Sequence, residues 1–515
     1  MKFLGIRNGH DSNLTYTDGR IVRYIKFERN FQQKHYNWGH RDGDDYAHLL
    51  TEAQRILGVT FDDLDAICLS NDNAHHALPR PLQLHELSMR VEGDSFFEQF
   101  RCPVFNIDHH YTHALSTWML TDLSRVRTHF VLDGLGDHGR VSGIFRDHQL
   151  VEYVDRTENL GLSVTMERIG EQYGMHGMVL DMSGKLMALK SYHNVPQELV
   201  EKVNVLTAPL QYRHLNQFIS VIEQVQNQTN VHQGDDKQKL INLAYFLHVF
   251  GEQKMADYFS RYADPSEVVT YSGGTAQNTV VNTTLRARFP HLHIPPHCPD
   301  DGLSFGCVEF LRQQFDQDPF DASGFPFWQS DVAPTSTPTA QTIDTAAELL
   351  AQGKIVGWYQ GQGEVGPRAL GNRSILMDPT LKGGKDLINA KVKHREPYRP
   401  FGASILHEYT NDIFHCDYES PYMLYVIECR DRERYASIVH VDGSCRIQTV
   451  NDQPQYAVYR DLIEAFRRKT GVPMVLNTSL NVDGKPIAGQ PDDALTLLKS
   501  SEMDAVVIGN EVFVK

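Results

Sequence analysis

The chain has 515 residues, of which 41% are hydrophobic, and a formal net charge of −16 at pH 7. That length exceeds one ordinary domain, so we expect two domains with ample material for packed cores. The acidic balance argues against a general nucleic-acid or membrane-surface binder, because such proteins carry a basic excess. Any site for a polyanion must therefore be local.

Seven cysteines are scattered along the chain and never stand in CxxC spacing. This usage favours reduced thiols over a disulfide framework or a zinc knuckle, and therefore predicts a cytoplasmic protein. Residues 1–11 show no apolar leader, and no apolar run approaches the roughly 18 residues that would cross a membrane. We expect no membrane contact.

The N-terminal segment alternates short apolar runs with polar loops. Residues 2–6 and 20–27 read as strands around a turn at 17–19, which predicts an opening hairpin. The loop 8–13 carries His10 and combines a glycine with short polar side chains. It suits a ligand-binding loop and, equally, a solvated turn.

Three side chains between residues 104 and 139 have the types and spacing of metal ligands. His109 and His113 stand four residues apart in a segment that predicts a helix, where they would share one face. The chain has 25 histidines, so such a pair also arises by chance. Asp133 ends a buried-looking strand before a glycine-rich turn, which suits a metal, a phosphate or an ordinary hairpin turn.

A second group of candidates follows the helical middle region. Residues 268–271 predict a strand, and Gly273 and Gly274 then lead into a helix, an arrangement that suits a nucleotide or phosphate. Asp300 and Asp301 precede another helix start. Two histidines and two carboxylates, each at the end of an element, suit a divalent ion such as iron, manganese or zinc.

The composition changes between residues 321 and 342. This stretch is rich in Pro, Ser, Thr and aromatic residues and shows no sustained period. We interpret it as an interdomain linker that separates a domain over 1–320 from a domain over 343–515.

The second domain contains a glycine-rich segment at residues 361–379, GQGEVGPRALGNRSILMDP. Its glycines leave backbone N–H groups open to an anion, and Arg368 and Arg373 can each grip a phosphate through two parallel hydrogen bonds. The alternative is a surface turn with two solvated arginines.

The charge around this segment favours the anion site. Between residues 353 and 399, nine Lys and Arg stand against four acids in a chain whose net charge is −16. Lys391, Lys393 and Arg395 alternate, which predicts one face of a strand. Like charges so close repel unless a polyanion lies between them. Asn477 ends a later strand, where it can read a carbamoyl-like or nucleobase edge or cap a turn.

Several motifs together carry a family resemblance that covers nearly the whole chain. They include DHHYTHALS, DGLGD, YSGGTAQN, PDDGLSFG, GQGEVGPRALGNRSIL, INAKVKHREPYRPFGASIL and PMVLNTSLNVDGKPI, in this order. The chain resembles the O-carbamoyltransferases of antibiotic, nodulation-factor and toxin biosynthesis, a group that includes the tobramycin and cephamycin enzymes.

The resemblance implies an α/β protein with two domains. The first is a duplicated actin/hexokinase-like (ribonuclease H-like) domain, and the second is a YrdC-like α/β domain. The YrdC-like domain would use carbamoyl phosphate and ATP, with Mg²⁺, to make carbamoyl adenylate. The first domain, with an Fe²⁺ ion, would then move the carbamoyl group to a hydroxyl of a small-molecule natural product.

The resemblance also implies roles for individual residues. The metal ligands would be His109, His113, Asp133 and Asp300, with Asp301 as the competing choice. Contacts to ATP and carbamoyl phosphate would come from Gly273, Gly274, Asn278, Arg368, Arg373, Lys391, Lys393, Arg395, Arg399, Arg446 and Asn477. Catalytic roles would fall to Asp133, Arg368 and Lys391, and His10 would accept the hydroxyl proton because imidazole titrates near neutral pH.

Two other functions remain open at this point. A tRNA threonylcarbamoyl-type modification enzyme would use the same two domain types, although the net acidity speaks against tRNA. A non-catalytic actin-like nucleotide-binding protein would leave the basic segment unexplained. Lys190 and Ser191 depart from the small residues that relatives often carry, so the acceptor stays unidentified, and a homodimer stays open as the assembly.

Overall fold

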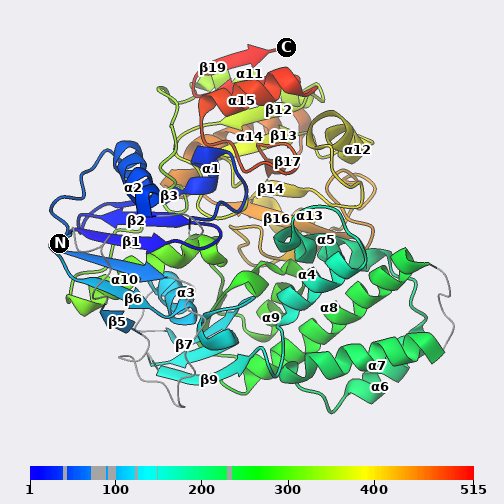
Figure 1. Ribbon diagram of the computed structural model, residues 1–515. Coiled ribbons are helices and arrows are strands. Elements are labelled where there is room, and N and C mark those ends of the chain that lie inside the picture. Colours follow the sequence, from blue (N-terminus) through cyan, green and yellow to red (C-terminus); the bar gives the residue numbers. More distant parts are fainter. Residues whose placement is uncertain (39–42, 71–87, 91–99, 122–125, 148, 229–234) are drawn as a thin grey trace. The chain divides into compact units, whose positions relative to one another are not determined.

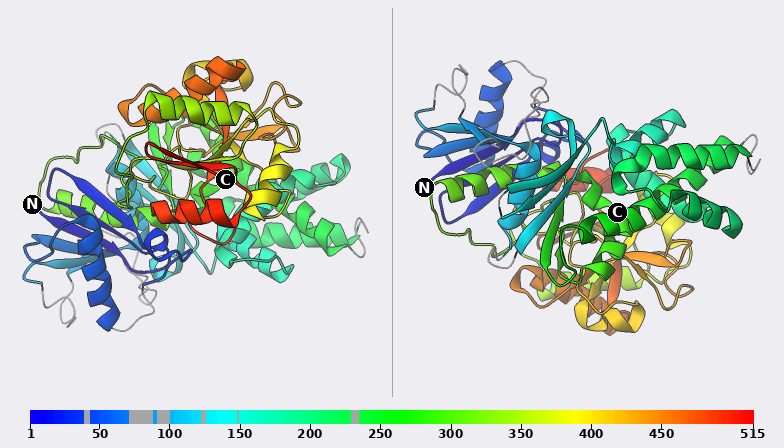
Figure 2. Two further views of the ribbon diagram at one scale, coloured as in Figure 1. Left: turned by 90° about the horizontal axis from the view of Figure 1, so that it is seen from above. Right: turned by 90° about the horizontal axis from the view of Figure 1, so that it is seen from below.

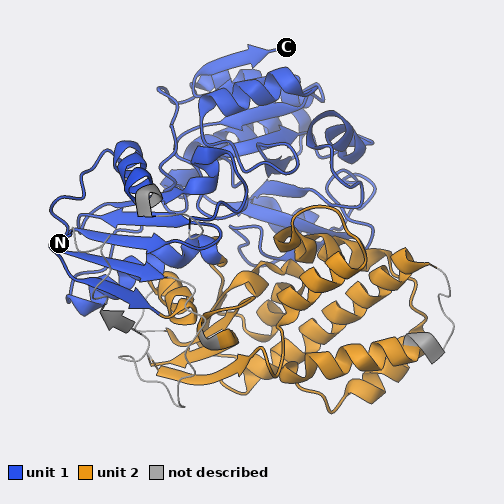
Figure 3. Cartoon of the chain, viewed as in Figure 1, with its two compact units in different colours: residues 1–71, 89–107, 300–515 blue, residues 72–88, 108–299 orange. Residues whose placement is uncertain are grey.

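The computed structural model describes residues 1–38, 43–70, 88–90, 100–121, 126–147, 149–228 and 235–515. They form a mixed α/β protein that divides into two compact units (Figure 3). Unit 1 comprises residues 1–71, 89–107 and 300–515, and unit 2 comprises residues 72–88 and 108–299. Among the described residues, no helix is both long and apolar enough to span a bilayer.

Unit 1 contains an N-terminal sheet with the strand order β3-β2-β1-β4-β6-β5 (Figure 1). Its strands are β1 Phe3–Arg7, β2 Asn13–Thr17, β3 Val22–Lys26, β4 Ala66–Ser70, β5 Ser88–Arg90 and β6 Val104–Ile107. The first three are antiparallel, and β4 runs parallel to β1. The predicted opening hairpin is therefore wrong in its pairing, because β3 pairs with β2 and the expectation missed β2.

Helices α1 Phe27–Phe31 and α2 Gly43–Leu57 follow β3 in the chain, and α10 Leu303–Gln314 packs on β1 and β4. Helix α10 lies directly on β1, since a Cβ atom at Gly5 would come within 2.3 Å of the Ser304 carbonyl oxygen. This close approach brings the start of α10 beside the loop that follows β1.

Unit 1 also contains a C-terminal sheet with the order β15-β16-β14-β17-β13-β12-β18-β19. Its strands are β12 Val356–Tyr359, β13 Arg373–Met377, β14 Gly402–Leu406, β15 Val426–Glu428, β16 Ser444–Val450, β17 Met474–Ser479, β18 Ala505–Ile508 and β19 Glu511–Val514. The associated helices are α11 Ala340–Ala351, α12 Gly384–Ile388, α13 Thr410–Ile413, α14 Ala457–Thr470 and α15 Pro491–Ser500. The buried side chains of β12, β13 and β17 form its core.

Two sequence expectations in this region meet a different structure. Residues 389–399 do not form a strand: α12 runs into a π-helical turn, Asn389–Lys393, which ends where His394 adopts a φ of 49°. The stretch interpreted as a linker packs tightly, with Trp328 buried and Gln329 bridged to both Tyr24 and Gly363. The segment 321–342, which its composition led us to interpret as a linker, thus packs against other parts of unit 1.

Unit 2 contains a sheet with the order β11-β10-β7-β8-β9. Its strands are β7 Val126–Leu132, β8 Arg140–Arg146, β9 Gln149–Asp155, β10 Val268–Ser272 and β11 Leu292–His293. Its helices are α3 His109–Trp118, α4 Leu162–Gln172, α5 Met182–Leu189, α6 Gln197–Thr207, α7 Leu215–Gln228, α8 Asp236–Ser260 and α9 Thr279–Arg288. The long α8 runs beside α7 in each view of Figure 2.

The unit 2 sheet repeats the topology of the N-terminal sheet. In each, three antiparallel strands are followed by two strands that run parallel to the first of them, and the N-terminal sheet has the additional strand β5 at its edge.

Candidate active site

Two histidines and one aspartate gather inside unit 2. Helix α3 begins at His109, and its N-cap residue Asp108 accepts a hydrogen bond from the Tyr111 N–H at 2.9 Å. His109 Nε2 lies 2.9 Å from Asp133 Oδ2, and His113 Nε2 lies 3.7 Å from the same oxygen. The predicted helix with both histidines on one face is confirmed.

The glycines after β10 hold this aspartate in place. Gly274 N–H donates to Asp133 Oδ1 at 2.6 Å. Gly273 has a φ of +94°, and a Cβ atom there would lie 2.2 Å from the Leu132 carbonyl oxygen. The Gly274 N–H that we expected to meet a phosphate is therefore used to orient a buried carboxylate.

Asn278, another predicted nucleotide contact, also has a structural role. Its side-chain oxygen caps α9 by accepting from the Val280 and Val281 N–H groups, each at 3.2 Å. Its Nδ2 lies 3.3 Å from His248 Nε2. Both ends of the amide thus have partners within unit 2.

The electrostatics of the cluster suit a divalent cation. Burial raises the pKa of Asp133, but hydrogen bonds with the His109 and His113 imidazoles outweigh burial and hold that pKa well below its usual range. An ionised carboxylate and two imidazoles on rigid elements form a donor set that iron, manganese or zinc accepts. The turn after Asp133 supports α3, because Asp137 Oδ2 accepts from the His109 N–H at 3.0 Å.

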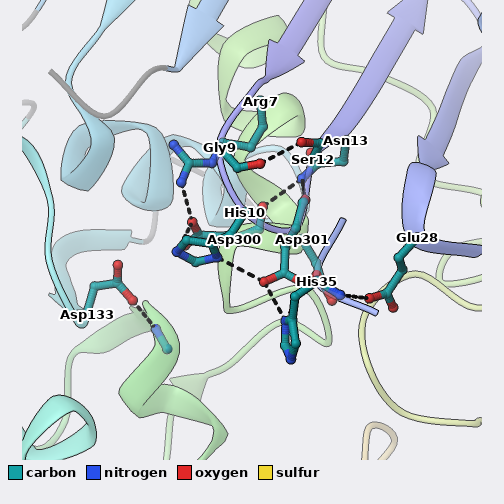
Figure 4. A network of polar contacts seen from close by, with 12 residues as sticks. Arg7, Gly9, His10, Ser12, Asn13, Glu28, His35, Asp133, Asp300 and Asp301 are labelled. Carbon is teal, nitrogen blue, oxygen red and sulfur yellow. Dashed lines mark hydrogen bonds and ion pairs between the residues drawn. The ribbon is translucent and has the colours of Figure 1, made fainter. Parts of the chain in front are cut away.

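The two aspartates at the start of α10 differ in their surroundings within unit 1. Arg7 Nη2 donates to Asp300 Oδ2 at 2.7 Å, and His10 Nε2 lies 3.5 Å from the same oxygen (Figure 4). Asp301 Oδ1 instead forms an ion pair with Lys26 Nζ at 2.6 Å. Each aspartate thus has a cationic partner, and the choice of Asp300 over Asp301 as a metal ligand stays a prediction.

His10 lies between two carboxylates. Burial lowers the pKa of His10, but the carboxylates of Asp300 and Asp11 outweigh burial and raise that pKa from 6.5 to about 9. Both carboxylates favour the protonated form of His10, and its role as a proton acceptor stays a prediction.

A cluster of guanidinium groups lies in the C-terminal part of unit 1. Its members are Arg368 in the glycine-rich segment, Arg395 and Arg399 after the π-helical turn, and Arg446 on β16. Burial and the neighbouring guanidinium of Arg399 lower the pKa of Arg395 to about 9. Burial and the guanidinium of Arg368 lower the pKa of Arg446 well below its usual range. Like charges so close repel one another unless an anion lies between them.

Three further cations predicted to bind the anion point elsewhere. Arg373 is fully buried, donates to Asp331 Oδ1 at 2.8 Å and stacks on Tyr359. Lys393 Nζ donates to the Ser479 carbonyl oxygen at 2.8 Å. Lys391 lies at the surface, with its Nζ 3.7 Å from Glu502 Oε2. The protein supplies acceptors to these cations, as it does to Arg395 through Asn389 and Pro400 and to Arg399 through Glu396 and Asp483. The anion-binding roles of Arg373, Lys391 and Lys393 stay predictions.

Asn477 lies buried on β17 below the glycine-rich segment. Its Nδ2 donates to Ser404 Oγ at 2.9 Å and to the Ala369 carbonyl oxygen at 3.2 Å. It therefore supports the backbone beside Arg368, and within the described structure its amide group faces protein atoms.

Comparison with known proteins agrees with this geometry. Residues 82–308 match the family model described as "Carbamoyltransferase N-terminus", and residues 347–515 match "Carbamoyltransferase C-terminus". The chain belongs to the carbamoyltransferase family. The first match contains His109, His113, Asp133 and Asp300, and the second contains the guanidinium cluster.

Individual relatives of this carbamoyltransferase-family chain match over part of their length. "Nodulation protein NolNO" of Sinorhizobium fredii is 35% identical over 270 residues, which cover 48% of this chain and 40% of that protein. "3'-hydroxymethylcephem-O-carbamoyltransferase" of Amycolatopsis lactamdurans is 34% identical over 250 residues, 46% of this chain and 47% of that protein. The matched part thus spans less than half of these relatives.

A solved structure, "Crystal structure of T.kodakarensis HypF", resembles the chain weakly. The likeness has a TM-score of 0.35 and 12% sequence identity, and covers 61% of this chain and 48% of the other. A TM-score at this level carries no conclusion about the fold.

Sequence reasoning missed a buried network centred on Lys26, most of whose members precede both family-model matches. Lys26 Nζ lies 2.6 Å from Asp301, 2.9 Å from Glu28 and 3.4 Å from Asp11. Burial lowers the pKa of Lys26, but these carboxylates raise it well above its usual range. His35 Nδ1 lies 3.0 Å from Asp11. The acids contact Lys26 through the fold of unit 1, so no spacing in the sequence could have indicated the network.

Proposed function

We propose that the protein is an ATP-dependent O-carbamoyltransferase that acts on a small-molecule hydroxyl. Carbamoyl phosphate and ATP would give carbamoyl adenylate, with loss of phosphate and pyrophosphate and consumption of one water. The carbamoyl group would then pass to the acceptor hydroxyl, and AMP would leave. The names of the relatives support a small-molecule acceptor, since one of them is a cephem O-carbamoyltransferase.

The observation that carries the proposal is the guanidinium cluster of Arg368, Arg395, Arg399 and Arg446. Carbamoyl phosphate and ATP together bring several negative charges, and more charge accumulates on phosphoryl oxygens during displacement. Four half-buried arginines from three segments of the chain can neutralise that charge. In a chain with a net charge of −16, such a local concentration of cations favours a specific role in anion binding.

The transfer step would use the group of His109, His113 and Asp133. With Asp300 as the predicted fourth ligand, these residues would hold a divalent ion, for which the family resemblance implies Fe²⁺. Such an ion supplies positive charge that polarises the carbamoyl carbonyl and balances the adenylate phosphate. Asp133 would be fixed for this task by the Gly274 N–H at 2.6 Å.

The fold supports a division of labour between parts of the chain. The repeated sheet topology is the feature expected of a duplicated actin/hexokinase-like domain, which would carry the transfer step. The eight-stranded sheet at 356–514 would be the YrdC-like domain that forms the adenylate. The two half-reactions would then depend on different residues.

The experiment measures the half-reactions separately with the full chain. Pyrophosphate release from ATP should require carbamoyl phosphate, and Arg368→Ala should abolish it while Arg432→Ala, at an exposed surface pair with Glu428, retains it as a matched control. His113→Ala should keep pyrophosphate release but lose formation of the carbamoylated acceptor, detected by mass spectrometry across polyhydroxylated acceptors. Pyrophosphate release that is independent of carbamoyl phosphate would refute the proposal, and so would a folded His113→Ala protein without either activity.

A further inference from the structure

Glu364 is a buried acid in the glycine-rich segment that the proposed chemistry does not use. Its side chain is fully buried. Its Oε1 accepts from the backbone N–H groups of Leu370 and Asn372, each at 2.8 Å, and of Arg373 at 3.0 Å. One carboxylate oxygen at the start of the loop 365–373 therefore binds three backbone N–H groups at the end of the same loop.

The consequence is a closed loop with Arg368 at its centre. Glu364 and Arg373 lie at the two ends, and the chain between them turns through Gly366, with φ of +89°, and Gly371, with φ of +113°. These values suit glycine and disfavour other residues. The loop therefore sets the backbone position of Arg368.

Other side chains hold the carbonyl groups of the same loop. Arg29 Nη2 donates to the Gly366 oxygen at 3.0 Å, and Gln448 Nε2 donates to the Leu370 oxygen at 2.8 Å. These contacts act on carbonyl groups, and Glu364 acts on the N–H groups. Without Glu364, the buried N–H groups of residues 370, 372 and 373 would lose their acceptor, which would destabilise this form of the loop.

The charge of Glu364 has a function that a neutral side chain would fulfil less well. Its second oxygen, Oε2, is buried and has no hydrogen-bond partner among the described residues. Burying an anion with one oxygen unsatisfied is unfavourable. The compensation lies at Oε1, since an ionised oxygen binds N–H donors about twice as strongly as a neutral one. Burial of the Glu364 side chain is therefore unfavourable in itself, and the hydrogen bonds at Oε1 make the loop rigid.

We propose that Glu364 is a positioning residue that holds the loop 365–373 in the form that presents Arg368 to a bound polyphosphate or carbamoyl phosphate. Glu364 touches no reacting atom and acts through Arg368. This inference rests on the proposed function for the identity of the substrate, but the positioning itself concerns only the binding of an anion.

The test measures binding of inorganic pyrophosphate by calorimetry to the full chain and three variants: Glu364→Gln, Arg368→Ala and the double variant. Glu364→Gln should weaken binding about tenfold, within the coupling range of residues that act together. In the Arg368→Ala background the same change should weaken binding less than twofold. Glu348→Gln, on the exposed side of α11, serves as the matched control and should bind like the wild type.

Several outcomes decide the matter. Equal binding by Glu364→Gln and wild type, additive losses in the double variant, or no binding by the wild type would overturn the positioning role. If Glu364→Gln does not fold, Glu364→Asp, which keeps the charge and shortens the reach, should show the same non-additive weakening. Wild-type pyrophosphate binding without carbamoyl-phosphate-dependent turnover would refute the proposed function and leave the positioning role standing.

Discussion

Replacing Arg373 by methionine should destabilise the C-terminal sheet without removing an anion contact. The Arg373 guanidinium binds Asp331 through Nη2 at 2.8 Å and Nε at 3.2 Å, and both side chains are fully buried. Methionine fills similar space but leaves the Asp331 carboxylate without its partner. Burial already raises the pKa of Asp331. Breaking a buried ion pair on one side costs about 3–5 kcal/mol.

A compensating variant sharpens this prediction. Replacing both residues, Arg373→Met with Asp331→Leu, removes the orphaned charge, and apolar replacements of buried pairs are often nearly neutral. The double variant should therefore recover most of the loss. Arg432→Met is the matched control, because Arg432 and Glu428 pair at the surface with half of each side chain exposed, and such pairs contribute little.

The assay is urea unfolding followed by hydrogen exchange of peptides from β13, which reports this sheet separately from the rest of the chain. Arg373→Met should lower the unfolding midpoint, and the double variant should raise it again. An Arg373→Met protein that unfolds like the wild type but fails to bind pyrophosphate would refute the reasoning, because Arg373 would then be an anion contact.

Two further predictions concern backbone geometry and pH. Gly371→Ala should unfold at a lower urea concentration than Gly383→Ala, because a Cβ at Gly371 would lie 2.2 Å from the Tyr459 ring whereas none of the described atoms lies within 4 Å of one at Gly383; equal midpoints would contradict it. Burial, aided by a nearby lysine, lowers the pKa of His248 from 6.5 to about 3, so its stabilisation is complete above pH 6.5 and is lost as the pH falls. Between pH 6.5 and pH 5 the free energy of unfolding of the wild type should fall by about 2 kcal/mol, and that of His248→Asn should not show this fall. Urea midpoints of the two proteins that change in parallel with pH would count against the prediction.

The motifs of unit 2 were readable because local geometry decides them. A four-residue spacing on a helix places His109 and His113 on one face whatever surrounds the helix. A carboxylate at a strand end meets the N-terminus of a neighbouring helix in many α/β arrangements. Asp133 and its contact with the histidines could therefore be anticipated, although the capture of the Gly274 N–H by Asp133 could not.

The C-terminal part of unit 1 was less readable because charge alone does not reveal a partner. Arg368 and Arg373 look equivalent in the sequence, yet Arg373 forms a buried ion pair with Asp331, which lies 42 residues earlier in the chain. Lys391 and Lys393 alternate as on a strand, but a π-helical turn sends one to the surface and buries the other.

The sequence by itself determined the family, the helix and strand positions of the candidate metal ligands, and the existence of a local basic region. Only the tertiary structure showed which acceptors each cation contacts, and it showed Glu364 at the base of the loop and Lys26 among three carboxylates. The physical reason is that periodicity and composition report on neighbours along the chain. Burial and pairing depend on groups that the fold brings together from distant segments.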